Sequence, residues 1–143
     1  SAGVAGLLIT DLPAGADPAV ERAVQESPLD LIRLVAPNTT PTRMREAVQG
    51  AGGFVYLIAR LGVTGASAAL ATDLEGSVGR VRDATTLPIA VGFGVSTAAQ
   101  ARTVAGFADG VVIGSALVDV LGREGVAAAG RFLADMRAAL DAA

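Results

Sequence analysis

The stretch Leu87-Pro88-Ile89-Ala90-Val91-Gly92-Phe93-Gly94-Val95-Ser96 decides the fold of this chain. Residues 89–93 form a short run without charged side chains between Pro88 and Gly94, which is typical of a strand buried on both faces. Directly afterwards, Thr97-Ala98-Ala99-Gln100 has the pattern of a capping box, which opens a helix. A buried strand followed at once by a helix predicts one βα unit of a parallel sheet.

The same unit recurs on both sides of this stretch. Mostly apolar runs predict four more strands, at 6–11, 31–35, 54–58 and 110–113. Helices are predicted to begin at Asp17-Pro18, at Thr40-Pro41 and at the capping box Thr72-Asp73-Leu74-Glu75, with two more over 116–121 and about 125–140. Helical spacing places the following side chains toward the core: Val20, Ala23, Val24, Met44, Ala47, Val48, Ala51, Leu74, Val78, Val81, Phe132, Leu133, Met136 and Leu140.

Five βα units in 143 residues predict an α/β fold in a single domain, 1–143, with right-handed crossovers. A closed (β/α)8 barrel needs roughly 250 residues, so five strands leave two open sheet edges. The pattern leaves three arrangements open. The remaining strands lie on sequence outside this chain, or the chain pairs with another copy, or the sheet is an open doubly wound one.

Missing residue types narrow the chemistry. The chain has no Cys and no His, and all 11 of its basic residues are Arg. Disulfides, imidazole catalysis and a Schiff-base lysine are therefore excluded within these 143 residues, and we expect no metal site. A net charge of −3, 3% aromatic residues and the lack of a long apolar run argue against nucleic-acid and membrane partners, so we expect a cytoplasmic protein.

Candidate binding residues follow the predicted strands, because ligand sites of parallel α/β folds lie at the carboxyl ends of the strands. Gly92-Phe93-Gly94 lets backbone approach a ligand closely, or simply makes a tight turn. Gly114-Ser115 opens a short helix whose first amides and serine hydroxyl favour an anion, although Ser115 alone could be only a helix cap. Together the two loops predict a phosphate site.

A third loop, Arg60-Leu61-Gly62-Val63-Thr64-Gly65-Ala66-Ser67, follows the strand that contains Tyr56. It is longer than most βα loops, which predicts a lid that closes over the ligand; the alternative is a solvated loop with a surface arginine. Gly65 would donate its N–H to the same phosphate, and Arg60 would steady the loop or the anion. Tyr56 belongs to the core or lines the pocket with its hydroxyl.

The acidic residues are weaker candidates. Asp11 either binds substrate hydroxyls or caps a turn, and Asp109 lies at the opposite end of the sheet, where we expect a structural role. The glutamates on the predicted helices are expected on solvated faces: Glu21, Glu26, Glu46 and Glu75.

Six segments, in this order and spacing, resemble the tryptophan synthase alpha chain family. They are Leu8-Ile9-Thr10-Asp11-Leu12-Pro13, Leu34-Val35-Ala36-Pro37-Asn38-Thr39-Thr40, Gly53-Phe54-Val55-Tyr56, Gly62-Val63-Thr64-Gly65-Ala66, the stretch quoted first, and Ala108-Asp109-Gly110-Val111-Val112-Ile113-Gly114-Ser115-Ala116. The resemblance spans essentially the whole chain and implies a TIM barrel, from about its fourth strand onward. It also implies retro-aldol cleavage of indole-3-glycerol phosphate to indole and glyceraldehyde 3-phosphate.

The resemblance implies roles for particular residues. Phosphate contacts fall on Gly65, Gly94, Gly114 and Ser115. Tyr56 and Phe93 lie near the substrate, and Thr64 and Arg60 belong to the mobile loop. The family's catalytic glutamate and aspartate belong to earlier strands, and no residue here matches them. We therefore expect that the amino-terminal strands are absent from this chain and that it does not turn over substrate alone.

The same resemblance implies a pyridoxal-phosphate beta subunit as partner, with the cofactor bound there and none in this chain. Two other phosphate-binding barrels, indoleglycerol-phosphate synthase and ribulose-phosphate epimerase, are disfavoured because they rely on lysine and on metal-binding histidines. The alternative from a different class is a non-catalytic half-barrel that binds phosphate and self-associates through its open sheet edges.

Overall fold

The computed structural model describes residues 3–58, 67–92 and 94–142, of which 67–73 by their backbone alone. Within these ranges five strands form one parallel sheet: β1 (Gly6–Leu8), β2 (Asp30–Val35), β3 (Val55–Ile58), β4 (Ile89–Gly92) and β5 (Gly110–Val112). Each strand pairs with the next in sequence. A doubly wound sheet reverses its strand order at a switch point, so the sequential order excludes that arrangement and agrees with part of a barrel wall.

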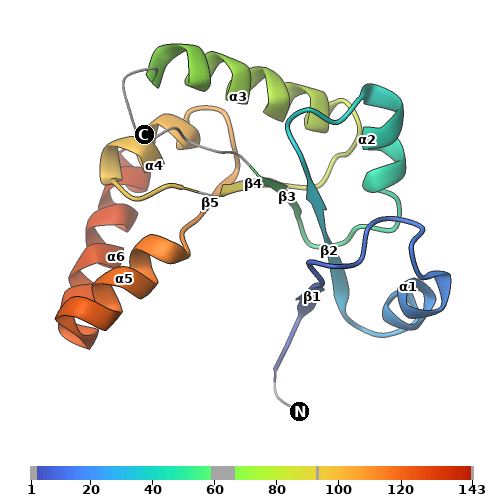
Figure 1. The fold of residues 1–143 in the computed structure, drawn as a ribbon, viewed down its shortest axis with the longest axis horizontal. Coiled ribbons are helices and arrows are strands. Elements are labelled where there is room, and N and C mark those ends of the chain that lie inside the picture. Colours follow the sequence, from blue (N-terminus) through green and yellow to red (C-terminus); the bar gives the residue numbers. More distant parts are fainter. Residues whose placement is uncertain (1–2, 59–66, 93, 143) are drawn as a thin grey trace.

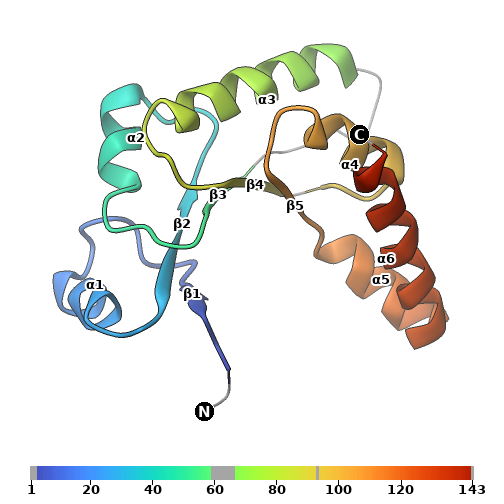
Figure 2. The same ribbon diagram turned by 180° about the vertical axis from the view of Figure 1, so that it is seen from behind.

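Helices follow the strands and lie around the outside of the curved sheet (Figures 1 and 2). They are α1 (Pro18–Gln25), α2 (Pro41–Ala47), α3 (Ser67–Arg82), α4 (Ala98–Ala105), α5 (Ser115–Glu124) and α6 (Val126–Asp141). All five predicted strands are confirmed, with carboxyl ends up to three residues earlier than expected. The largest difference is at β1, because the chain turns away after Leu8 and Leu12 N–H donates to the Ile9 carbonyl at 3.4 Å.

Three helix starts follow the predicted caps. The Asp17 carboxylate accepts the amides of Ala19 and Val20, and Thr40 accepts the amide of Arg43. Thr97 and Gln100 form both halves of a capping box. The cap expected at Thr72 is wrong, because α3 already begins at Ser67. The alanine-rich residues before Thr72 are strong helix formers and extend the helix upstream.

The hydrophobic core lies between the outer face of the sheet and the helices. Alternate strand residues such as Val55, Leu57, Ile89 and Val91 are fully buried there. The helices cover them with the predicted residues Met44, Leu74, Val78, Val81 and Met136, while Ala47, Val48, Ala51, Phe132 and Leu140 pack around the edge. Val20, Ala23 and Leu133 are exposed instead. Small residues of α6 take the inward positions that Leu133 was expected to share: Ala128, Ala129 and Ala139.

The opposite face of the sheet is the concave face that would line a barrel. The strand register brings three rows of residues together on it. Leu8 pairs with Ile32, Leu34 with Tyr56 and Ala90, and Ile58 with Gly92 and Val112. Most of these side chains are half-buried. The face therefore supports a site at its carboxyl edge, where the loops after the strands meet.

Candidate phosphate-binding site

Three described strands end side by side where the sequence predicted the site. Ile58, Gly92 and Val112 occupy one register row at the carboxyl ends of β3, β4 and β5. The loops that follow β4 and β5 therefore leave the sheet next to each other (Figure 1). This places Gly94 and Gly114-Ser115 at one corner of the sheet, as expected. Arg60, Thr64, Gly65 and Phe93 lie outside the described residues, so their predicted contacts remain predictions.

Gly94 occupies a backbone conformation that favours glycine. Its φ of 97° is in the left-handed region, where a side chain would be strained. The next residue, Val95, is 2% exposed and anchors the loop in the core. Gln100 then holds the loop's far end, because its Oε1 accepts the amides of Ser96 and Thr97 at 2.9 and 3.1 Å. Gly94 is exposed, and the loop is held on its carboxyl side by Val95 and Gln100.

The amino terminus of α5 begins directly after β5. Gly114 takes the N-cap position, and no side chain in the described part of the chain caps the helix, so the first helical residue is Ser115 rather than a capping serine. Unpaired amides of the first turn point outward along the helix axis and carry partial positive charge. A Cβ built on Gly114 would meet nothing within 4 Å among the described residues. Open space next to unpaired amides is what an anion needs.

Tyr56 lies on the concave face and reaches toward the same corner. A Cβ on Gly92 would lie 2.5 Å from the Tyr56 hydroxyl and 2.6 Å from its ring carbon Cε2, so the ring passes directly over this glycine. Burial raises the pKa of Tyr56 above its usual value of 10.0. The phenol therefore stays neutral at physiological pH and can donate a hydrogen bond. The ring is half-buried, and the predicted contact of its hydroxyl with substrate remains a prediction.

Asp109 lies at the other end of the sheet and has structural contacts, as expected. Its Oδ2 accepts the Ile89 amide at 2.9 Å and pairs with Arg82 at 3.1 Å. The Ile89 amide, followed by the Arg82 charge, lowers the pKa of this carboxyl against the opposing effect of burial. Asp11 is exposed in the turn after β1, and its proposed role with substrate remains a prediction.

Sequence reasoning missed one polar pair. Glu21 was expected on a solvated face, but its side chain is only 15% exposed and pairs with Arg33 at 2.8 Å. Arg33 lies in the middle of β2 and is 4% exposed. An arginine within an otherwise apolar strand run, with an acid on the following or preceding helix, is the signal that could have identified the pair.

The sequential parallel sheet, its outer helices and the corner at β4 and β5 define the class of βα-barrel proteins, of which this chain forms part of the wall. Residues 1–139 match the family model of the tryptophan synthase alpha chain. The chain belongs to this family. No helix in the described part of the chain is long and apolar enough to cross a membrane.

Individual relatives agree with the family assignment. The chain is 42% identical over 142 residues to the tryptophan synthase alpha chain of Novosphingobium aromaticivorans, covering 99% of this chain and 53% of the relative. It is 48% identical over 121 residues to that of Acidiphilium cryptum, covering 85% of this chain and 44% of the relative. The chain thus spans about half the length of these relatives.

Solved structures give the same result for the fold. The alpha subunit of tryptophan synthase from Legionella pneumophila superposes with a TM-score of 0.83 at 32% identity, over 99% of this chain and 53% of that one. An aminoacrylate-bound tryptophan synthase from M. tuberculosis superposes with a TM-score of 0.81 at 34% identity, over 95% of this chain and 50% of that one. The five-stranded sheet is therefore half of an alpha-subunit TIM barrel.

Proposed function

We propose that this chain supplies the phosphate-binding half of an alpha-subunit barrel that cleaves indole-3-glycerol phosphate to indole and glyceraldehyde 3-phosphate. One observation carries the proposal. The uncapped amino terminus of α5 and the left-handed Gly94 lie at the ends of adjacent strands, with open space beside Gly114. Amides that converge from two loops bind a phosphate without any cationic side chain.

The other residues act around this anion site. The Tyr56 hydroxyl would orient the substrate from the concave face. Gly65, Thr64 and Arg60 would close the lid loop over the phosphate, and Phe93 would contact the substrate's apolar part. We assign no catalytic residue within these 143 residues. The family's acid–base glutamate and indole-binding aspartate would come from the strands that complete the barrel, so this chain would be the carboxyl-terminal part of that single barrel domain.

The same proposal covers the partner and the cofactor. The whole protein would work in the cytoplasm with a beta subunit, which receives indole and carries pyridoxal phosphate. No lysine occurs in this chain, so its residues do not fit a Schiff base to that cofactor. The cofactor therefore belongs to the partner in this proposal.

A charge at the helix terminus tests the phosphate site. Ser115→Asp places a carboxylate where the anion would lie, and we expect inorganic phosphate to bind roughly tenfold or more weakly by calorimetry because like charges repel at short range. The helix itself should not suffer, since a carboxylate in the first turn stabilises it. Thr42→Asp at the exposed start of α2 is the matched control and should leave phosphate binding unchanged. Equal binding by both variants would contradict the proposed location.

Catalysis has a separate test. The purified chain alone is expected to release no indole above background, because a missing general acid–base usually costs about 10² to 10⁴-fold in rate. Indole release at the rate of a full alpha subunit would contradict this. A chain that elutes as a stable dimer and binds phosphate would favour the alternative half-barrel module. That alternative has one supporting observation, the half-buried apolar concave face with Leu8 39% exposed.

A further inference from the structure

The loop between β1 and α1 lies at the carboxyl edge of the sheet, on the same edge as the proposed site. It carries Asp11 and Pro13 and turns twice, through Leu12 N–H to the Ile9 carbonyl and Ala16 N–H to the Pro13 carbonyl. These turns shape the loop locally but do not attach it to the sheet.

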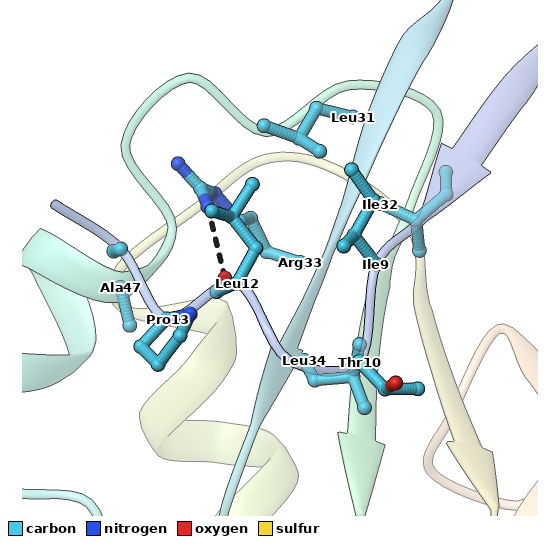
Figure 3. A pocket seen from close by; sticks show the side chains of 10 residues that line it. Ile9, Thr10, Leu12, Pro13, Leu31, Ile32, Arg33, Leu34 and Ala47 are labelled. Atoms are coloured by element: carbon cyan, nitrogen blue, oxygen red, sulfur yellow. Dashed lines mark hydrogen bonds between the residues drawn. The ribbon is translucent and has the colours of Figure 1, made fainter. Parts of the chain in front are cut away.

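The buried ion pair between Arg33 and Glu21 contacts the loop. Arg33 extends from the outer face of β2, and its Nη2 lies 2.8 Å from Glu21 Oε2 on α1. The other carboxylate oxygen of Glu21 accepts the Gly15 amide at 2.7 Å, within the loop. Arg33 Nη1 also donates to the Leu12 carbonyl at 3.5 Å (Figure 3). The strand is thus linked to both halves of the loop through one guanidinium and one carboxylate.

Side-chain packing between the loop and β2 is incomplete. A cavity of about 160 Å³ lies between the loop and β2, bordered by Thr10, Leu12 and Pro13 on one side and Leu31 and Arg33 on the other (Figure 3). The buried Arg33 Nε hydrogen has no acceptor among the described residues. The polar bonds therefore span a gap that the apolar residues leave open.

Energetics favour a positioning role over a stabilising one. Removing two charges from water costs several kcal/mol, and a buried ion pair replaced by apolar residues of similar size often leaves stability unchanged. Neighbouring positions on the same face of β2, Leu31 and Val35, are apolar and 3% exposed. An apolar residue at position 33 would fill the layer equally well but could not hold backbone groups of the loop.

We propose that Arg33 and Glu21 are positioning residues that hold the β1–α1 loop, and with it Asp11, in place at the carboxyl edge of the sheet. The inference concerns the loop and stands whether or not phosphate binds at β4 and β5. Each variant below is therefore also tested for phosphate binding, which the anchor should not affect.

Amide hydrogen exchange separates the two roles. In Arg33→Met/Glu21→Met the Gly15 amide loses its bond to the Glu21 carboxylate, and the Ala16 amide lies in the turn that this bond holds. We expect both amides to exchange roughly tenfold faster. Core amides of Val55 and Val91 should exchange as in the wild type. Arg33→Lys retains the charge beside Glu21 and should restore most of the Gly15 protection. The backbone amide chemical shift of Asp11 should change in the double variant and should be close to the wild-type value in Arg33→Lys.

The exposed pair Arg43 and Glu46, joined at 2.9 Å, offers a matched control. Arg43→Met/Glu46→Met removes the same groups from the surface and should leave the loop unchanged. Wild-type exchange at Gly15 and Ala16 in Arg33→Met/Glu21→Met would overturn the inference, since the turns alone would then hold the loop. Equal acceleration of loop and core amides would also overturn it, because the pair would then be merely structural.

Discussion

Replacing Gly92 with alanine is expected to destabilise the fold by about 2 kcal/mol, because overfilling a packed site costs about 1–3 kcal/mol. The added methyl would lie 2.5 Å from the Tyr56 hydroxyl, 2.6 Å from Tyr56 Cε2 and 2.7 Å from Val112 Cβ. Carbon atoms pack best at about 3.5–4.0 Å, so the methyl overlaps neighbours on two sides by roughly 1 Å. Movement of the half-buried Tyr56 ring relieves the overlaps on its own side but not the overlap with Val112.

Urea unfolding, followed by far-UV circular dichroism, measures this change. With an m-value of about 2 kcal/mol/M, the Gly92→Ala midpoint should fall by roughly 1 M. Gly79→Ala is the matched control, because a Cβ at this exposed glycine of α3 meets no described atom within 4 Å. That control should instead raise stability by about 0.5–1 kcal/mol, since alanine favours a helix.

The second half of the experiment assigns the overlap to its partner. Tyr56→Ala removes two of the three close contacts. The free energy of unfolding of the double variant should therefore be about 1 kcal/mol higher than the sum of the two single-variant effects predicts. The overlap with Val112 remains and keeps the recovery partial. Wild-type stability of Gly92→Ala, or a destabilisation independent of the residue at position 56, would refute the reasoning.

Four further substitutions concern residues at the ends of elements. Asp109→Asn should lower stability at neutral pH by about 0.5–1 kcal/mol, a small value because Asp109 and Arg82 are partly exposed. Since the folded pKa of Asp109 is lowered, its contribution is complete above the unfolded pKa near 3.8 and is lost as the pH falls below it. Urea midpoints of wild type and variant should therefore converge as the pH falls below about 3.8, and a constant difference into that acid range would contradict the assignment. Asp17→Ala should cost about 1 kcal/mol by loss of the α1 cap, with unchanged stability as the contrary result. Gly94→Ala should lower the free energy of unfolding by about 1 kcal/mol, because its φ lies in the left-handed region. Gly114→Ala has open space for its methyl, so it should keep its stability but bind phosphate more weakly in calorimetry.

Most of the fold followed from local patterns in the sequence. Continuous apolar runs identified all five strands, since strands buried on both faces carry no polar alternation. Caps at Asp17, Thr40 and Thr97 identified three helix starts, because each is a local hydrogen bond between neighbouring residues. The cap predicted at Thr72 was wrong, because a local motif does not exclude a helix that starts further upstream.

Features that depend on contacts between distant residues were harder to predict. The partnership of Glu21 and Arg33 joins a helix to the next strand, and only the packed structure brings them to 2.8 Å. Leu133 fits the helical stripe of α6, yet small alanines of that helix pack inward and leave Leu133 45% exposed. The role of Gly92 beneath Tyr56 likewise depends on strand register. The loops that carry Gly94 and Gly114-Ser115 could be placed after adjacent strands because parallel strands end at the same edge of a sheet, while their phosphate contacts remain predictions.

The central claim is that the ends of β4 and β5 bind a phosphate through backbone amides. Titration of isotopically labelled protein with inorganic phosphate, followed by amide chemical shifts, tests it most directly. The account predicts saturable shifts at Gly94, Ser115 and Ala116, with little change at the amino termini of α1 and α2. Shifts spread evenly over all helix termini, or absent from Gly94 and Ser115 while others move, would contradict it.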